Sequence, residues 1–215
     1  MRKQEKRNSK ILNMIKEHVR TNIKYYFTIA IVFLIGIVIG VMFINNIDEN
    51  QKNQIGDYLC TFTEALNSDY KVDTNNLLKS SITNNLLLAL LLWFIGSTVV
   101  GIPIVYIIIC IRGFFLGYTL SSIIVTYNVW KGTLFSLCTL LLQNIIFIPC
   151  ILALSVSGIR LYKSIIKDKR KENIKIEILR HTIFSGFIAI FLVLASFVEV
   201  YASSNLLTIC IKIFA

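Results

Sequence analysis

Residues 84–130 read NNLLLALLLWFIGSTVVGIPIVYIIICIRGFFLGYTLSSIIVTYNVW, an apolar stretch whose only charged residue is Arg112. Within it, residues 86–111 are 26 apolar or small residues in succession. A helix of that length would extend about 39 Å at 1.5 Å per residue, whereas the hydrocarbon core of a bilayer is about 30 Å thick. The stretch is therefore predicted to lie in a membrane.

Two features predict that this stretch turns back on itself. Pro103, two residues after Gly101, lacks an amide hydrogen, so the helix is expected to bend or break at about residues 99–103. A charge is costly at the bilayer centre, so Arg112 is expected at a membrane surface, with Gly113 starting the return. The stretch is interpreted as a kinked hairpin of two spans.

The composition of the whole chain indicates an integral membrane protein. Of its 215 residues, 55% are hydrophobic and only 16% are charged, and the apolar residues fall in long blocks. The net charge of +10 does not indicate nucleic-acid binding, because the basic residues cluster beside apolar blocks, as cytoplasmic flanks do. Five cysteines without a C-x-x-C pair are interpreted as buried apolar residues, and we expect no disulfide framework, metal site or cofactor.

The chain begins with a basic arm, residues 1–26, in which Ile11, Ile15, Val19 and Ile23 recur every four positions. Such an apolar stripe fits either an interfacial helix bound to anionic lipid or a topogenic flank with a helical extension. The topogenic flank is the favoured interpretation.

The first span is predicted at residues 27–44. It contains Gly36 and Gly40, a G-x-x-x-G pair that places two small residues one turn apart on a helix. Such a pair allows a second helix to approach closely. Close packing or a kink is likewise expected at Gly96, Gly101, Pro103, Gly113 and Gly117.

Residues 45–85 form one long polar loop with six acidic residues and three lysines, the reverse of the basic arm, so the loop is predicted outside the cell. Within it, Tyr58, Leu59, Phe62 and Leu66 follow helical spacing and form an apolar face. The face either lies on the membrane or on other loops of the chain, or it is a docking surface for an extracytoplasmic partner. Both interpretations stay open, and these four residues are the candidate partner-binding site.

A further apolar run, residues 133–159, is interrupted by Gln143 and Asn144 and bent by Pro149. Buried amides need partners, and hydrogen bonds across a helix interface contribute about 0.6–2 kcal/mol. A clamp between two helices is favoured over a transport pathway, because a carrier usually has ionisable residues at mid-depth and none is expected here.

The distribution of charge predicts the topology. Residues 160–181 are basic and are expected inside with the arm, the last span is expected at residues 182–200, and residues 202–215 form a short outer tail. Three crossings between residues 86 and 159 complete a membrane domain at residues 27–201. We predict an all-α bundle of about five transmembrane helices, with the N-terminus inside and the C-terminus outside. This arrangement puts 17 of the 22 Lys and Arg residues on the cytoplasmic side once Arg112 is counted there.

The sequence contains no recognisable catalytic motif. It has no H-E-x-x-H, Walker A or G-x-S-x-G sequence, and its only histidines are His18 and His181. No nucleophile lies at a usable spacing from a base. We therefore expect neither enzymatic activity nor a small-molecule substrate.

The order of these features resembles the stage II sporulation protein M family of endospore formers, over about residues 10–205. The resemblance rests on the basic arm, the Gly36-xxx-Gly40 span, the polar outer loop, and the path from Asn84-Asn85-Leu86 through Gly96 and Gly101-Ile-Pro103 to Arg112-Gly113-Phe114-Phe115-Leu116-Gly117. Arg112 stands where the family often has the asparagine of an Asn-Gly pair.

The resemblance implies a multi-pass protein of the septal and engulfing mother-cell membrane. There it would be a non-catalytic scaffold that recruits and anchors two extracytoplasmic peptidoglycan hydrolases, sporulation proteins D and P, while the membrane migrates around the forespore. The alternative function is a transporter or permease subunit for a small solute. In that case the break at Gly101–Pro103 and the Gln143–Asn144 pair would line a cavity.

Overall fold

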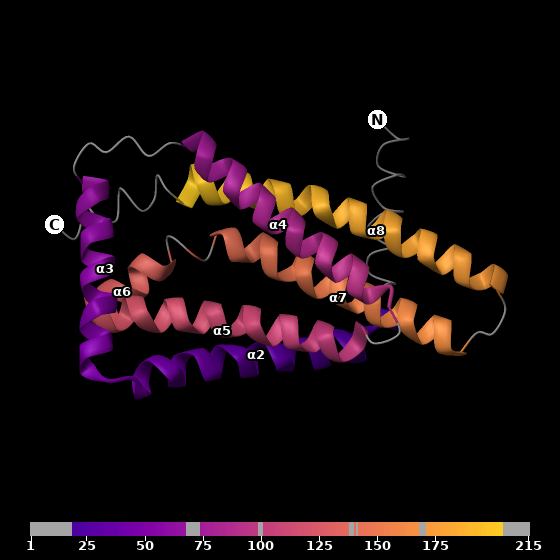
Figure 1. The fold of residues 1–215 in the computed structure, drawn as a ribbon, viewed down its shortest axis with the longest axis horizontal. Helices are drawn as coiled ribbons and strands as arrows, with labels where there is room; N and C mark the ends of the chain where they lie inside the picture. Colours follow the sequence, from indigo (N-terminus) through magenta and orange to yellow (C-terminus); the bar gives the residue numbers. More distant parts are fainter. Residues whose placement is uncertain are drawn as a thin grey trace.

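The computed structural model describes residues 19–67, 74–98, 101–137, 140, 142–167 and 171–203. Every secondary-structure element in these residues is a helix (Figure 1), and five of the described helices are long and apolar enough to cross a membrane. They are α2 (Ile23–Asn46), α4 (Thr74–Gly96), α5 (Gly101–Tyr127), α7 (Leu142–Lys167) and α8 (Lys171–Phe197). The prediction of an all-α membrane bundle with five spans is therefore confirmed. The sidedness of its termini stays a prediction, and most of the basic arm and nearly all of the tail lie outside the described residues.

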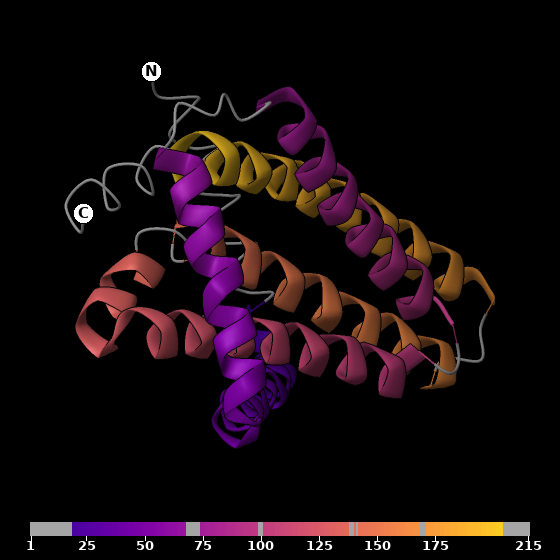
Figure 2. The ribbon, with the colours of Figure 1, turned by 60° about the vertical axis from the view of Figure 1, so that its left-hand side comes forward.

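The long helices lie side by side in two groups (Figure 1). α2 and α5 form one closely packed pair, and α4, α7 and α8 form the other group, with α7 also contacting α2 and α5. The shorter elements are α3 (Glu49–Asn67), α6 (Val129–Ser136) and the π-helical η2 (Val198–Ser203). α3 runs across the ends of the long helices instead of along them (Figure 1, Figure 2). We call this end of the bundle the α3 end.

One large apolar cluster forms the main core of the bundle, and every spanning helix contributes to it. Ile29, Leu92, Ile109, Leu154 and Leu192, one from each spanning helix, are at most 1% exposed. The outward faces of the same helices also carry large apolar side chains, such as those of Phe27, Leu34, Phe94, Ile107 and Ile190. Lipid tails are as apolar as these side chains, so the outward faces are suited to contact with a bilayer.

The turn within residues 86–111 lies earlier than expected. α4 ends at Gly96 and α5 begins at Gly101, so the chain reverses between these two glycines. α5 then continues without interruption through Arg112, which is in the middle of the helix. The predicted return at Arg112 and Gly113 was wrong, and so were the expectations that Arg112 lies at a membrane surface and that no ionisable residue lies in the middle of a span.

Local backbone geometry explains why the chain turns here. Pro103 lies in the first turn of α5, where its missing amide hydrogen removes no helical bond. A Cβ atom on Gly101 would lie 2.0 Å from the Ile95 carbonyl oxygen, so the turn requires a glycine at this position. The proline therefore starts a new helix instead of kinking a long one.

α4 begins well before the apolar run that predicted it. Residues 74–85, which the sequence assigns to the polar outer loop, form the first half of this helix. Only residues 86–96 of α4 are continuously apolar. The polar half lies toward the α3 end, where it packs against α8 and η2 (Figure 1).

The apolar run at residues 133–159 is not a single helix. Asn128 has a φ of 69° and a ψ of 158°, a backbone conformation that is rare for any residue except glycine, and it separates α5 from α6. α6 packs back on α5 so closely that a Cβ atom on Gly132 would lie 2.7 Å from the Ile124 Cα atom. With eight residues, α6 is too short to span a bilayer. The span is instead α7, which extends into the predicted basic loop at residues 160–181.

Candidate functional site

Four glycines bring α2 and α5 into backbone contact. A Cβ atom on Gly36 would lie 2.2 Å from the Cys110 carbonyl oxygen, and one on Gly40 would lie 2.2 Å from the Phe114 carbonyl oxygen. On the facing helix, Cβ atoms on Gly113 and Gly117 would each lie 2.2 Å from a carbonyl oxygen of α2, those of Phe33 and Ile37. We call Gly36, Gly40, Gly113 and Gly117 the glycine seam. It holds α2, and hence the start of α3, at a fixed distance from α5.

A buried histidine joins three helices at the end of the bundle opposite α3. His181 of α8 is 2% exposed, and its Nδ1 atom lies 2.8 Å from the Ser157 hydroxyl of α7. Its Nε2 atom lies 3.4 Å from the Trp93 carbonyl oxygen of α4. Beside it, a Cβ atom on Gly96 would lie 2.8 Å from the Gly158 Cα atom. Both ring nitrogens face a polar group, so this histidine has a packing role that its position in the sequence does not reveal.

Polar contacts join the first half of α4 to α8 and η2 near the α3 end. The Asn85 side-chain amide donates a hydrogen bond to the Ser196 hydroxyl oxygen, at 2.8 Å, and both residues are buried. One turn earlier, the Ser81 hydroxyl donates to the Glu199 carboxylate. These bonds satisfy polar groups that would otherwise be costly within a bilayer. They explain how a helix with a polar half can belong to the bundle.

Tyr127, the last residue of α5, attaches α3 to the bundle. Its hydroxyl donates to the Leu59 carbonyl oxygen at 3.0 Å and lies 3.0 Å from the Thr63 hydroxyl oxygen. The Tyr127 ring stacks on Phe135 of α6, with ring centroids 5.4 Å apart. A tyrosine at the end of an apolar span is a recognised signal of an interfacial anchor, so the sequence places Tyr127 at the outer membrane surface, but it does not show that its hydroxyl binds α3.

The structure separates the four residues predicted to bind a partner. Leu59 packs against the buried side chains of Ile123 and Phe135 and therefore faces its own chain. Tyr58 and Phe62, one turn apart on α3, are 74% and 45% exposed. The backbone of Leu66 lies in α3, but its side chain is outside the described residues. The apolar face predicted from the sequence thus has an inward-facing member and two exposed members.

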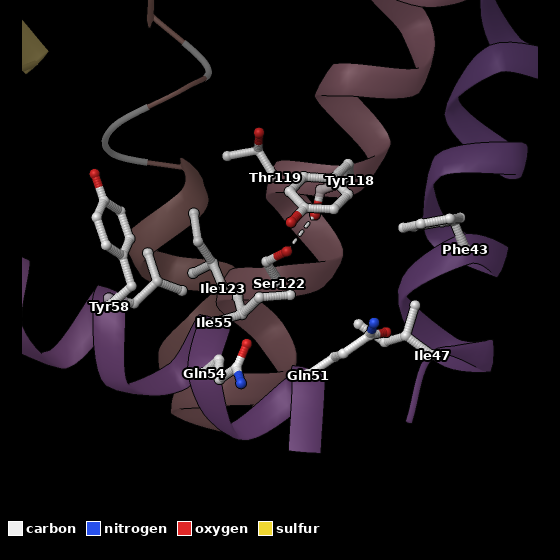
Figure 3. Close-up of a pocket in the computed structure, with 11 residues that line it drawn as sticks. Phe43, Ile47, Gln51, Gln54, Ile55, Tyr58, Tyr118, Thr119, Ser122 and Ile123 are labelled. Atoms are coloured by element: carbon white, nitrogen blue, oxygen red, sulfur yellow. Dashed lines mark hydrogen bonds between the residues drawn. The ribbon is translucent and has the colours of Figure 1, made fainter. Parts of the chain in front are cut away.

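A groove of about 590 Å³ opens between α2, α3 and α5 (Figure 3). We call it the platform groove. It is lined by Phe43, Ile47, Gln51, Gln54, Ile55, Tyr58, Leu59, Tyr118, Thr119, Ser122 and Ile123. Its walls are mostly apolar, with side-chain amides and hydroxyls among them. Such a surface suits a partner with apolar side chains flanked by polar groups.

The two amides predicted to clamp helices at mid-depth lie elsewhere. Gln143 and Asn144 are in the first turn of α7, at the α3 end. The Asn144 amide nitrogen donates to the Leu140 carbonyl oxygen at 2.7 Å, a contact within its own segment. This correction follows from the later start of α7. The two features that favoured a transporter, the chain break and the amide pair, therefore lie at helix ends and not in the middle of a span.

Among the residues that the structure describes, no group of three or more His, Cys, Asp or Glu side chains could hold a metal ion. Comparison with curated proteins and with solved structures finds no match. Comparison with protein-family models matches residues 29–204 to stage II sporulation protein M. This match covers all five spanning helices except the first residues of α2. The chain is thus a multi-pass, sporulation-related membrane protein that belongs to the stage II sporulation protein M family.

Proposed function

We propose that this protein is a non-catalytic membrane scaffold that recruits and anchors peptidoglycan-degrading proteins at the septal membrane during forespore engulfment. Its partners would be extracytoplasmic hydrolases, namely sporulation proteins D and P. Membership of a sporulation family supports the setting. The observation that carries the scaffold role is α3, an amphipathic helix fixed across one end of the bundle with Tyr58 and Phe62 exposed.

The charges at the two ends of the bundle support this orientation. At the α3 end, α3 itself carries three acidic residues, Glu49, Asp57 and Glu64, and one lysine, Lys52. At the opposite end, basic residues lie near the ends of the spanning helices, among them Lys24, Arg160, Lys163, Lys175 and Arg180. Because basic residues are retained in the cytoplasm, the α3 end would face the cell wall, where hydrolases act.

A rigid platform fits recruitment better than catalysis. The glycine seam fixes α2 against α5, and Tyr127 fixes α3 to α5. The exposed face of α3 is therefore already in position before a partner binds. Preorganisation of this kind lowers the entropic cost of binding. Cleavage of peptidoglycan would then belong to the partners, while this chain would determine where they act.

The recruitment proposal is tested by adding charge to the exposed face. Changing Tyr58 and Phe62 to Asp should reduce co-purification of sporulation proteins D and P from sporulating cells by at least tenfold, because desolvating two carboxylates opposes an apolar contact. The matched control changes Asn53 and Thr61 to Asp, which adds the same charge at two other exposed positions of α3. Equal recovery from both variants would remove this face from the proposal.

The non-catalytic part of the proposal has a separate test. The purified chain in lipid nanodiscs should release no more soluble fragments from dye-labelled peptidoglycan than empty nanodiscs do. Release by the purified chain alone would make it a membrane-bound hydrolase and would contradict the scaffold role.

A further inference from the structure

The backbone of Arg112 lies level with the middle of the α2 span. The glycine seam fixes its level, because a Cβ atom on Gly36 would lie 2.2 Å from the Cys110 carbonyl oxygen and 3.0 Å from the Phe114 backbone nitrogen. Gly36 is at the middle of the apolar run at residues 27–44 of α2. Arg112 lies between Cys110 and Phe114 along α5, so its backbone is level with the middle of the apolar run of α2.

In the part of the chain that the structure describes, no carboxylate pairs with Arg112. Its guanidinium group lies over the Phe147 ring of α7, with the Cζ atom 5.6 Å from the ring centroid. The acidic residues of the described segments lie on or just before α3, in the first two turns of α8 and in η2, and none lies in the middle of a span. A charged side chain at this depth is normally paired and functional.

A second groove runs along the same face of α5. It has a volume of about 490 Å³, lies between α5, α6 and α7, and is lined by Leu116, Leu120, Ile124, Thr133, Ser136, Leu137, Leu140, Asn144, Ile145, Ile148 and Pro149. We call it the α5–α7 groove. Arg112 does not line this groove, but Leu116 is one helical turn from it and Ile148 adjoins Phe147, so Arg112 lies about one turn beyond the end of the groove.

We propose that the α5–α7 groove binds a transmembrane segment of a partner protein and that Arg112 forms an ion pair with an Asp or Glu at the middle of that segment. The mostly apolar walls fit the side chains of a membrane helix. The planar guanidinium group matches a carboxylate in a bidentate arrangement. The inference goes beyond the scaffold role proposed above, because the partner need not degrade peptidoglycan.

Other sources of negative charge fit less well. Lipid phosphates lie at the bilayer surface, about 15 Å from the mid-plane of a hydrocarbon core about 30 Å thick, which exceeds the reach of an arginine side chain. A second copy of this chain would present its described acidic residues near the ends of the bundle, at the wrong depth. A partner helix with a carboxylate at its middle satisfies both the depth and the charge.

Photocrosslinking in sporulating cells tests the proposal on the full chain. A benzophenone amino acid replaces Leu120 in the α5–α7 groove, and the control replaces Val38, which is exposed on α2. The Leu120 probe should capture a peptide from a transmembrane segment with an Asp or Glu near its middle. The yield should fall at least tenfold in Arg112→Met, because the partner's carboxylate is then buried unpaired, and should largely persist in Arg112→Lys. The Val38 probe should give the same products in all three backgrounds.

A charge exchange keeps the test decisive if Arg112→Met fails to accumulate. Arg112→Asp should abolish capture, and an Arg in place of the partner's carboxylate should restore it. Capture of lipid only, of a second copy, or of a segment without a carboxylate would overturn the proposal, as would equal capture by Arg112→Met. Recovery of hydrolases through Tyr58 and Phe62 is a separate readout, so either proposal can fail while the other stands.

Discussion

The absence of Cβ atoms at four glycines sets the distance between α2 and α5. At each of Gly36, Gly40, Gly113 and Gly117, the atom that any other residue would add falls on a carbonyl oxygen of the facing helix. The G-x-x-x-G spacing in α2 made close packing predictable. Gly113 and Gly117 repeat this spacing in α5, but the spacing alone does not show that these two pairs face each other.

Gly40→Ala should destabilise the protein. The added methyl group would lie 2.2 Å from the Phe114 carbonyl oxygen, so α2 and α5 must separate. Overpacking of this kind costs about 1–3 kcal/mol, which should lower the melting temperature in detergent by several degrees. Gly186→Ala is the matched control, because a Cβ atom there meets nothing within 4 Å. Equal melting temperatures for the two variants would contradict the role of the seam.

At the scale of helices, the number of spans was predictable and their ends were not. Residues 86–111 form one apolar run, and nothing in that run shows whether Pro103 kinks a helix or starts one. Residues 74–85 resemble a loop because their partners, Ser196 and Glu199, are far away in the sequence. Boundaries that depend on tertiary contacts cannot be predicted from local pattern alone.

At the candidate site too, the sequence pattern predicted the helix, whereas tertiary packing determines which of its residues are exposed. Helical spacing predicted an apolar face on residues 55–66, and a helix with such a face is present. Spacing alone does not separate Leu59, which packs on Ile123, from Tyr58 and Phe62, which are exposed. Separating them requires the position of α3 relative to α5.

Tyr127→Phe should loosen α3 without unfolding the bundle. The change removes the hydrogen bonds to Leu59 and Thr63, each worth about 0.5–1.5 kcal/mol, and leaves the aromatic stacking in place. Hydrogen–deuterium exchange in nanodiscs should therefore become faster in peptides from α3 and stay unchanged in peptides from α7. Tyr201→Phe, at an exposed tyrosine near the end of α8, is the control. Unchanged exchange in α3 would show that its apolar contacts alone hold it.

In the folded molecule, charged residues that are far apart in the sequence lie together at the two ends of the bundle. Basic residues from the start of α2, the end of α7 and the start of α8 meet at one end, and the acidic residues of α3 meet at the other. This asymmetry predicts that the α3 end faces the outside of the cell. The scaffold proposal depends on that orientation, because its partners act on the cell wall.

Cysteine labelling measures the orientation directly. In a variant that keeps only Cys60, which is exposed on α3, a membrane-impermeant maleimide should label intact cells whose wall has been removed. In a cysteine-free background, Lys175→Cys, at an exposed position near the start of α8, should be labelled only after the membrane is permeabilised. The reverse result would place α3 in the cytoplasm and would exclude extracytoplasmic partners at this face.

The polar half of α4 has a consequence for how the protein is made. Asn85 and Ser81 find their partners 111 and 118 residues further along the chain, on α8 and η2, which are translated after α4. Only residues 86–96 of α4 are continuously apolar, and α4 is the least hydrophobic of the five spanning helices. We therefore expect α4 to become stable in the bilayer only once α8 and η2 are in place beside it.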